Sequence, residues 1–519
     1  MRLGVAFQTL GCKLNQLETD ALVDSFKEAG ASILPSGLAE GGSELDLFVL
    51  NTCTVTGKAE QKARRAARAV LARRPYAVVI ATGCYAQLDP GGLEALGERI
   101  VAVPGDDKAA ILGLSRWLAE RWQGHGDLLD AVREWKAEPR SPGEGADRFA
   151  FHPESFAFHS RPALKVQDGC DNRCSYCRVC LARGSSRSLP LPEAVARARS
   201  LEASARAEAV LTGVNLSQYR DGGTGFPGLL AALLEGTENL AFRISSYEPD
   251  RVDEDFLSVF ARERVRPHAH LPVQSGADPV LAKMGRGYRR DKVLRAVEAL
   301  RRVKGDLFLA ADIIAGFPGE TDEDFAATLD FCRRADFAWI HAFPFSPRPG
   351  TRAYELKPRV PERVAGERVA ELGELARSGR RAYAERWTGA EVEAVIEGGD
   401  VESDDGEEGA AAEGAHGSTS EGEDVEEARV PRLEETAPVR GSLRFGDASA
   451  RFGEASTRLG DASPRLGDAT MRLGTSANYL KLRIEEVPPG LRPGCAVRCR
   501  IIRALPFDET GFDALARLA

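Results

Sequence analysis

Three cysteines in a C-x3-C-x2-C pattern constrain this chain more than any other feature. Cys170, Cys174 and Cys177 follow directly after an apolar, strand-like run. Three thiolates so close in sequence can bind three irons of a cubane iron–sulfur cluster and leave the fourth iron open to a small molecule. A structural zinc site is the alternative, but zinc normally takes four ligands in two spaced pairs. The spacing therefore favours a catalytic iron–sulfur cluster.

Length and composition bound the class of protein. The chain has 519 residues, which predicts roughly three to four domains. It contains no apolar run of about twenty residues, so no transmembrane helix is expected, and its first residues lack the apolar core of a signal peptide. Ten cysteines are sparse for this length, which favours metal chemistry in a reducing cytoplasm over a disulfide framework. We therefore expect a cytoplasmic protein.

The net charge of −9 is unevenly distributed along the chain. Residues 399–440 hold fourteen acidic residues and three arginines, a local balance of −11, so the rest of the chain carries +2. A near-neutral body with local basic patches is compatible with nucleic acid as a partner.

Residues 1–120 alternate strand and helix signals, which predict a parallel sheet with helices on its faces. A helix with a capping box formed by Asn15 and Glu18 is expected after the first strand. A second helix is expected over about Lys58–Arg74, with its cations on a solvated face. The predicted strands are Arg2–Leu10, Leu45–Leu50 and Ala77–Thr82.

A cysteine follows each of these three strands. Cys12, Cys53 and Cys84 stand beside glycine or threonine, which let a ligand approach the backbone. The carboxyl ends of parallel strands meet at one edge of a sheet, where ligands bind in such folds. Three unrelated core cysteines are the alternative, since free cysteine is often buried. The repeated placement favours a second cluster.

A second series of strands and helices begins at Arg161. About six such units predict a closed or partial parallel barrel, in which functional groups gather at the carboxyl ends of the strands. The predicted strands are Leu164–Gln167, Ala209–Thr212, Ala241–Ser245, Ala269–Val273, Leu307–Ile314 and Trp339–Phe343.

The C-terminal part alternates as strands do over 391–396, 478–484 and 495–502. Between the first two lies an acidic tract whose composition predicts disorder, followed by a seven-residue repeat that begins at Arg444. Each repeat unit has one large apolar residue and a glycine, so it lacks a coiled-coil seam and is low-complexity sequence. We expect a small antiparallel β-barrel split by one long insertion.

The predicted class is thus α/β, with three folded domains. The N-terminal parallel-sheet domain covers 1–140 and a linker covers 141–160. The partial barrel covers 161–386. The C-terminal β-barrel is assembled from 387–398 and 475–519, and the low-complexity insertion covers 399–474.

Three segments together resemble the radical-SAM methylthiotransferase family: Thr9–Gln16, Val166–Cys177 and Gly316–Thr321. The resemblance covers about residues 1–400 and resumes at about 475–505. It implies an N-terminal methylthiotransferase domain, a radical-SAM (β/α) partial barrel and a C-terminal TRAM-like domain that binds RNA. The residues after Cys12, together with Leu211–Asn215, are most similar to the MtaB-type branch.

The resemblance implies two [4Fe-4S] clusters and S-adenosylmethionine as cofactors. Position by position, Cys12, Cys53 and Cys84 match ligands of the auxiliary cluster, and Cys170, Cys174 and Cys177 match ligands of the radical-SAM cluster. The open iron would chelate S-adenosylmethionine, whose cleavage releases a radical that abstracts hydrogen from C2 of adenine. The second cluster would supply sulfur, methylated by a second S-adenosylmethionine. No general acid or base is therefore expected beyond the cluster ligands.

Polar residues at the barrel strand ends are the candidates for contact with S-adenosylmethionine. Hydrogen bonding within the barrel core is the alternative for each of them. The candidates are Thr212, Gly213, Asn215, Arg243, Ser245 and Gln274.

The branch implies methylthiolation of N6-threonylcarbamoyladenosine at position 37 of tRNA. The expected partners are the anticodon stem-loop of tRNA, an electron donor and a sulfur source. Three alternatives stay open: a methylthiotransferase acting on isopentenyl-adenosine tRNA, one acting on a ribosomal protein, and a non-catalytic iron–sulfur protein that binds RNA.

Two features depart from the family pattern. Arg178–Leu181 replaces the usual apolar pair and proline, and it includes a fourth thiol, Cys180, which we expect to be an inert bystander. The acidic insertion adds negative charge to a module whose expected partner is polyanionic, so it should weaken RNA binding or stay clear of the RNA.

Overall fold

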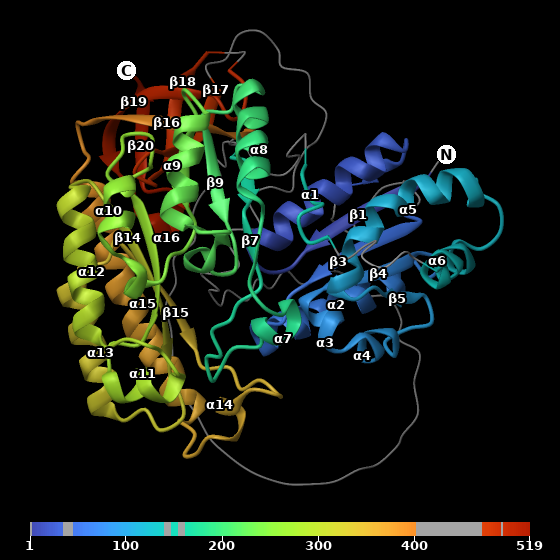
Figure 1. The fold of residues 1–519 in the computed structure, drawn as a ribbon, viewed down its shortest axis with the longest axis horizontal. Helices are drawn as coiled ribbons and strands as arrows, with labels where there is room; N and C mark the ends of the chain where they lie inside the picture. Colours follow the sequence, from blue (N-terminus) through green and yellow to red (C-terminus); the bar gives the residue numbers. More distant parts are fainter. Residues whose placement is uncertain (1–2, 35–44, 140–146, 154–160, 401–469, 489–490) are drawn as a thin grey trace, which may run out of the picture. The chain divides into compact units, whose positions relative to one another are not determined.

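The N-terminal part of the chain is a parallel sheet with strand order β2-β1-β3-β4-β5 (Figure 1). The computed structural model describes residues 3–34, 45–139, 147–153, 161–400, 470–488 and 491–519. The sheet confirms the predicted class of this region, and it contains two short strands that were not predicted, β2 and β5. Its strands are β1 (Gly4–Thr9), β2 (Ser32–Leu34), β3 (Leu47–Thr52), β4 (Val78–Gly83) and β5 (Ile100–Ala102).

Helices cover both faces of this sheet because its strands are buried and apolar on each side. Phe26 and Leu114 pack with Val49 on one face, and Ala67 packs with Val79 on the other. The first face carries α1 (Lys13–Glu28), α5 (Ile111–Trp117) and α6 (Leu128–Ala137), and the second carries α2 (Gly57–Arg73) and α4 (Pro90–Glu94).

The predicted capping box at the start of α1 is wrong. The helix begins at Lys13 with Cys12 as its N-cap residue, and no side chain caps it. The Asn15 side chain instead turns inward and donates to the carbonyls of Leu10 (2.9 Å) and Thr52 (3.1 Å). Asn15 thus ties together the loops that follow β1 and β3.

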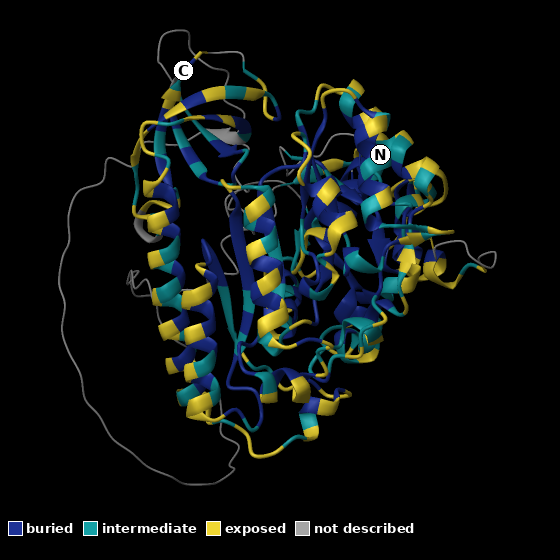
Figure 2. Cartoon of the chain, turned by 60° about the vertical axis from the view of Figure 1, so that its left-hand side comes forward, coloured by how far each residue is buried: buried dark blue, intermediate teal, exposed yellow. Residues whose placement is uncertain are grey.

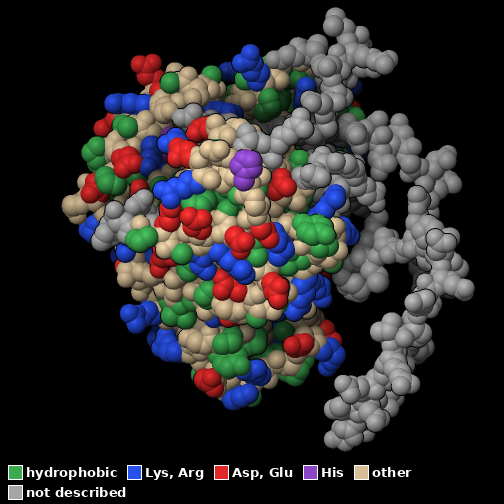
Figure 3. Space-filling model, turned by 90° about the vertical axis from the view of Figure 1, so that its right-hand side faces the viewer, with side chains coloured by type: hydrophobic (Ala, Val, Ile, Leu, Met, Phe, Trp, Pro, Cys, Tyr) green, Lys and Arg blue, Asp and Glu red, His purple; other side chains and the backbone are tan. Residues whose placement is uncertain are grey.

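The surface of the N-terminal part carries both signs of charge. Acidic and basic side chains intermingle on the face shown in Figure 3. Lys58, Arg65, Arg68 and Arg73 lie on the exposed side of α2, as expected for a solvated face. Within the described ranges, no helix is long and apolar enough to cross a membrane.

The central part is the predicted partial barrel. Two parallel three-stranded sheets, β6-β9-β12 and β13-β14-β15, follow one another in chain order. A bridge between Phe242 and Val265 links the end of the first sheet to the segment that leads into the second. The strands are β6 (Ala163–Lys165), β9 (Glu208–Thr212), β12 (Ala241–Ile244), β13 (His268–Gln274), β14 (Phe308–Ala315) and β15 (Trp339–Pro344).

Amphipathic helices cover the outer face of the barrel, with buried strands beneath them and exposed residues outside (Figure 2). In α12, for example, Val293, Val297 and Leu300 are buried, whereas Arg295 and Glu298 between them are exposed. These helices are α8 (Leu191–Ala203), α9 (Phe226–Gly236), α10 (Glu254–Phe260), α12 (Arg290–Val303), α13 (Asp322–Ala335) and α15 (Glu362–Glu385).

The C-terminal part is a closed five-stranded barrel with strand order β16-β17-β18-β20-β19. All neighbouring strands are antiparallel except β18 and β20. Its core includes Ile396, Leu482 and Ile501. The strands are β16 (Glu391–Asp400), β17 (Thr470–Ser476), β18 (Lys481–Val487), β19 (Ala496–Ala504) and β20 (Ala514–Leu518).

One boundary of this barrel differs from the sequence-based one. Strand β17 begins at Thr470, so residues 470–474, assigned above to the insertion, belong to the barrel. They pair with β16 on one side and with β18 on the other. The amino-acid composition of the repeat does not reveal this backbone pairing. The acidic tract and most of the repeat lie outside the described residues.

Candidate active site

Cys12, Cys53 and Cys84, the N-terminal trio, lie at one edge of the N-terminal sheet. Each follows the carboxyl end of β1, β3 or β4. Gly11 (φ +118°) packs so closely on Cys53 that a Cβ would lie 2.8 Å from the Cys53 Cβ and 3.0 Å from its Sγ. The predicted convergence of the three loops is therefore present, and glycine is required where the first loop meets the second.

The thiols of the N-terminal trio interact electrostatically with one another. Burial, together with the charges of Cys84 and Cys12, raises the pKa of Cys53 to about 12. Cys84 is buried as well, whereas Cys12 is exposed. Buried thiols of this kind ionise when they bind a metal.

A single metal ion does not suit these thiols. Among the described residues, no three His, Cys, Asp or Glu side chains are close enough to hold one ion. A tetrahedral zinc site would bring its sulfurs within roughly 4 Å of one another. The thiolates of a cubane cluster bind different irons and stand farther apart. The N-terminal trio as placed in the described structure therefore does not form a single-ion zinc site.

Cys170, Cys174 and Cys177, the barrel trio, lie in a loop after β6. The short strands β7 (Gln167–Asp168) and β8 (Arg187–Ser188) pair and close the two ends of this loop. Inside it, the Ser175 backbone is held on both sides: its N–H donates to the Met284 carbonyl (2.8 Å), and its carbonyl accepts from the Ala353 N–H (2.7 Å). The loop is therefore fixed to two other parts of the barrel.

Protein donors surround the sulfurs of the barrel trio. Arg286 Nη1 lies 3.3 Å from Cys174 Sγ, and Asn215 Nδ2 lies 3.8 Å from Cys170 Sγ. Burial raises the pKa of Cys177 to about 12. Arg286 was not among the predicted site residues, because nothing local in its sequence marks a side chain that folds back over a loop more than a hundred residues earlier.

The strand ends beside the barrel trio contain unpaired polar atoms. Asn215 Oδ1 and Ser245 Oγ are buried without a hydrogen-bond partner in the described part of the chain. A Cβ on Gly213 would lie 2.8 Å from Gln167 Oε1, so the backbone there has no room for a side chain. Thr212 is buried at the end of β9, and Gln274 ends β13 with a φ of +74°.

Buried, unpaired polar atoms are costly unless a ligand satisfies them. Asn215 Oδ1 can accept from an ammonium group, and Ser245 Oγ can donate to a carboxylate or accept from an N–H. Both lie at strand ends next to the barrel trio, so this edge suits the amino-acid part of S-adenosylmethionine.

Arg243 was a candidate for contact with S-adenosylmethionine, but its side chain does not lie at the ligand edge. Its guanidinium is fully buried and forms a two-pronged ion pair with Glu208 (2.6 and 3.0 Å). It also donates to the carbonyls of Ser476 and Ala477 in the C-terminal barrel. Glu208 begins β9, so Arg243 points toward the amino ends of the strands rather than toward the ligand edge. The position of Arg243 in the sequence of β12 does not reveal in which direction its side chain points.

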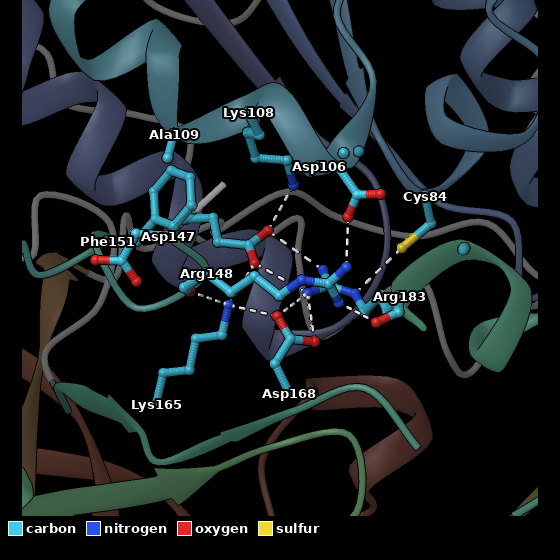
Figure 4. Close-up of a pocket in the computed structure, with 14 residues that line it drawn as sticks. Cys84, Asp106, Lys108, Ala109, Asp147, Arg148, Phe151, Lys165, Asp168 and Arg183 are labelled. Carbon is cyan, nitrogen blue, oxygen red and sulfur yellow. Dashed lines mark hydrogen bonds and ion pairs between the residues drawn. The ribbon is translucent and has the colours of Figure 1, made fainter. Parts of the chain in front are cut away.

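A buried ion network joins the two trios (Figure 4). Arg183, at the end of α7 (Val179–Arg183), donates from Nε to Cys84 Sγ (3.3 Å). Its Nη1 lies 3.0 Å from both Glu18 and Asp168, and its Nη2 donates to Asn15 Oδ1 (2.7 Å). Glu18 and Asn15 come from α1, whereas Asp168 and Arg183 flank the barrel trio.

The buried network places charged side chains of both signs beside the Cys84 thiol. Lys108 and Lys165 also pair with Glu18, at 2.5 and 3.0 Å, and Lys165 pairs with Asp168 at 2.7 Å. Burial alone would raise the pKa of Asp168, but Arg183 and Lys165 lower it to about 2. Arg148 and the carboxylates of Asp106 and Asp147 line the same pocket, so its four cations face four carboxylates, and Arg183 is the cation that contacts the Cys84 thiol. The donor set therefore fits a metal-bound, ionised cysteine at that position.

A second contact links the N-terminal part to the barrel beside Cys53. Glu60 of α2 accepts from Arg348 and from Arg178 (3.1 Å), and its Oε1 also accepts from Thr54 Oγ1 (2.5 Å). The Gly57 N–H donates to Ser346 Oγ (3.1 Å). The segment Phe345–Thr351 after β15 thus contacts the domain that bears the N-terminal trio.

Two family models match the chain. The Radical SAM superfamily matches residues 164–332, and the Uncharacterized protein family UPF0004 matches residues 4–105. Among solved structures, the radical S-adenosylmethionine methyltransferase TsrM from Kitasatospora setae, with cobalamin and a [4Fe-4S] cluster bound, has a TM-score of 0.50 and 16% identity. That likeness covers 68% of this chain and 74% of TsrM, and it supports the fold alone.

Curated relatives match most of the chain. The threonylcarbamoyladenosine tRNA methylthiotransferase MtaB of Treponema pallidum is 42% identical over 76% of this chain and 91% of the relative. MtaB of Bacillus subtilis is 32% identical over 76% and 84%. The tRNA-2-methylthio-N(6)-dimethylallyladenosine synthase of Sorangium cellulosum is 36% identical over 78% and 83%. The chain therefore belongs to the radical-SAM methylthiotransferase family, in its MtaB-type branch.

Proposed function

We propose that this enzyme adds a methylthio group to C2 of N6-threonylcarbamoyladenosine at position 37 of tRNA. The observation that carries this proposal is the similarity to MtaB enzymes over three quarters of the chain, at up to 42% identity. The two cysteine trios at the ligand edges of two parallel sheets support the same reaction, because methylthiolation needs a radical source and a sulfur source.

The cofactors of this family are two [4Fe-4S] clusters and S-adenosylmethionine. The N-terminal trio holds the auxiliary cluster, and the barrel trio holds the radical-SAM cluster. When bound, these cofactors supply a 5′-deoxyadenosyl radical, a sulfur atom and a methyl group, which side chains alone cannot supply.

The protein positions and shields these groups. Asn215 and Ser245 contact S-adenosylmethionine through their unpaired oxygens, with Thr212, Gly213 and Gln274 shaping the same edge. Arg286 and Asn215 donate toward the sulfurs of the barrel trio. Such donors stabilise thiolate ligands and orient them.

The other partners follow from this reaction. The C-terminal barrel acts as a TRAM-like module that binds the anticodon stem-loop, and a tRNA substrate places the enzyme in the cytoplasm. An electron donor must reduce the radical-SAM cluster, and a sulfur source must restore the auxiliary cluster after turnover.

Mass spectrometry of tRNA nucleosides tests the substrate. Cells that lack this protein should lose 2-methylthio-N6-threonylcarbamoyladenosine and regain it when the gene is returned. Anaerobically reconstituted enzyme should modify tRNA that carries N6-threonylcarbamoyladenosine. Activity only on tRNA with dimethylallyl-adenosine, the substrate named for the Sorangium relative, would refute the assignment and support that alternative.

A further inference from the structure

One guanidinium in the buried network contacts the loops of both trios. Every donor group of Arg183 is engaged: Nε with Cys84 Sγ (3.3 Å), Nη1 with Glu18 and Asp168, and Nη2 with Asn15 and Glu18. The side chain is 9% exposed. A group that is buried and fully bonded in this way has little freedom to move.

The partners of Arg183 lie close to both trios in the sequence. Asp168 stands two residues before Cys170, and Arg183 itself lies six residues after Cys177. Asn15 stands three residues after Cys12 and bonds the Thr52 carbonyl, next to Cys53. Both ends of the barrel-trio loop and all three loops of the N-terminal trio are therefore tied to one side chain or its immediate partner.

The contact with Cys84 has an electronic consequence as well as a structural one. Hydrogen bonds to cluster sulfurs and local net charge set the reduction potential of an iron–sulfur cluster. Arg183 supplies both a donor and a positive charge directly beside Cys84 Sγ. Positive charge stabilises the reduced, more negative state of a cluster.

We infer that Arg183 is a positioning residue that raises the reduction potential of the auxiliary cluster and holds that cluster in register with the barrel trio. This inference rests on the proposed function, in which Cys84 ligates the auxiliary cluster. If Arg183 served only to pair with Glu18 and Asp168, its replacement would leave the reduction potential of the auxiliary cluster unchanged.

Arg183→Gln and Arg183→Lys separate these roles. Glutamine removes the positive charge and the planar, multidentate guanidinium. Lysine keeps the positive charge but loses the Nε donor. Lys108→Gln is the matched control, because Lys108 is buried in the same network and pairs with Glu18 (2.5 Å). Lys108 donates to the Glu18 carboxylate and to Asn51 Oδ1, neither of which is a sulfur.

The measurement is a redox titration of the reconstituted full-length proteins, followed by electron paramagnetic resonance. Added S-adenosylmethionine perturbs the radical-SAM cluster and so distinguishes its signal from that of the auxiliary cluster. We expect the auxiliary potential to fall most in Arg183→Gln, less in Arg183→Lys and least in Lys108→Gln, while the radical-SAM potential stays at its wild-type value. Loss of the auxiliary cluster from both Arg183 variants, with retention in Lys108→Gln, would equally support the positioning role.

An unchanged auxiliary potential in cluster-loaded Arg183→Gln, or shifts of equal size in Arg183→Gln and Lys108→Gln, would overturn the inference. The wild-type protein separates this failure from failure of the proposed function. If its iron content is about four rather than about eight atoms per chain, the ligand assignment is wrong. If the wild-type protein holds about eight iron atoms per chain and the auxiliary potential is the same in wild type and Arg183→Gln, only the role of Arg183 is wrong.

Discussion

The six cysteines of the two trios divide into chemically separable sets. Cys84→Ala should lower the iron content from about eight to about four atoms per chain, keep cleavage of S-adenosylmethionine to 5′-deoxyadenosine, and abolish the methylthiolated nucleoside. Cys170→Ala should abolish both reactions, because the radical source is lost. Iron analysis and chromatography of the nucleoside products measure these outcomes. Cys332→Ala, a buried thiol in α13 outside both trios, is the control and should change neither reaction.

Cys180 lies next to the barrel trio without joining it. Its Sγ lies 3.9 Å from the Cys177 carbonyl, within α7 and the loop before it. We therefore expect Cys180→Ala to keep both the reconstituted iron content and the rate of S-adenosylmethionine cleavage. Loss of the radical-SAM cluster in this variant would mean that the fourth thiol is a ligand and that the three-ligand assignment is wrong.

Residue positions were predictable where chain topology alone determines them. Cys12, Cys53 and Cys84 meet because parallel strands end at one edge, and strand and helix alternation is visible in the sequence. Arg183 and Arg286 were not predictable as site residues. Their sulfur partners, Cys84 and Cys174, lie 99 and 112 positions away. Packing of the N-terminal domain against the barrel brings Arg183 to its sulfur, and the folding of the barrel itself brings Arg286 to its own.

At the scale of elements, Arg243 joins the radical-SAM barrel to the C-terminal barrel. It links β12 to β9 through Glu208 and to the turn after β17 through two backbone carbonyls. Arg243→Met should destabilise the protein by about 3–5 kcal/mol, because it leaves a buried carboxylate with fewer partners. Urea denaturation measures the change. Arg517→Met, which removes a half-exposed pair with Glu485, should cost no more than about 1 kcal/mol.

The same carboxylate makes stability depend on pH. Burial alone would raise the pKa of Glu208, but Arg243, Arg161 and Arg266 lower it to about 2. Its folded-state pKa lies below the unfolded value of about 4.3. Its contribution is therefore present above pH 4.3 and is lost as the pH falls toward 2.

Glu208→Gln isolates this contribution. The variant should be less stable than the wild type at pH 7, and the difference should shrink between about pH 4.3 and pH 2. Thermal melts of both cluster-free proteins across this range measure it. A constant difference in melting temperature would contradict the assigned pKa.

The start of strand β17 could not be predicted from the sequence pattern. Its first two residues end the repeat unit that begins at Arg465, and Arg472 begins the last, partial unit. The spacing and glycines of these units predict low-complexity sequence. These residues form a strand because β16 and β18 offer free backbone partners on both sides and because the barrel closes only with them. Pairing of this kind is a property of the assembled sheet rather than of the seven-residue pattern.

At the scale of the whole molecule, the long segment 401–469 enters and leaves the C-terminal barrel at neighbouring positions. Asp400 of β16 pairs with Arg472 of β17, so a short turn can replace the segment without moving either strand. Residues 399–440 carry a net charge of −11, which repels a phosphate backbone. The segment therefore contributes nothing attractive to RNA binding through its charge.

Replacement of residues 401–469 by a short Asn-Gly turn tests this argument, because such a turn joins antiparallel strands directly. We expect the shortened protein to keep its melting temperature and both clusters. Its affinity for the anticodon stem-loop should be equal to that of the full chain or higher, with the gain largest at low ionic strength, where charge repulsion is least screened. Binding isotherms at two salt concentrations measure this difference. A control that keeps the segment but replaces its acidic residues with the matching amides should reproduce the gain. A collapse of RNA affinity in the shortened protein, with the melting temperature intact, would show that the segment binds the substrate.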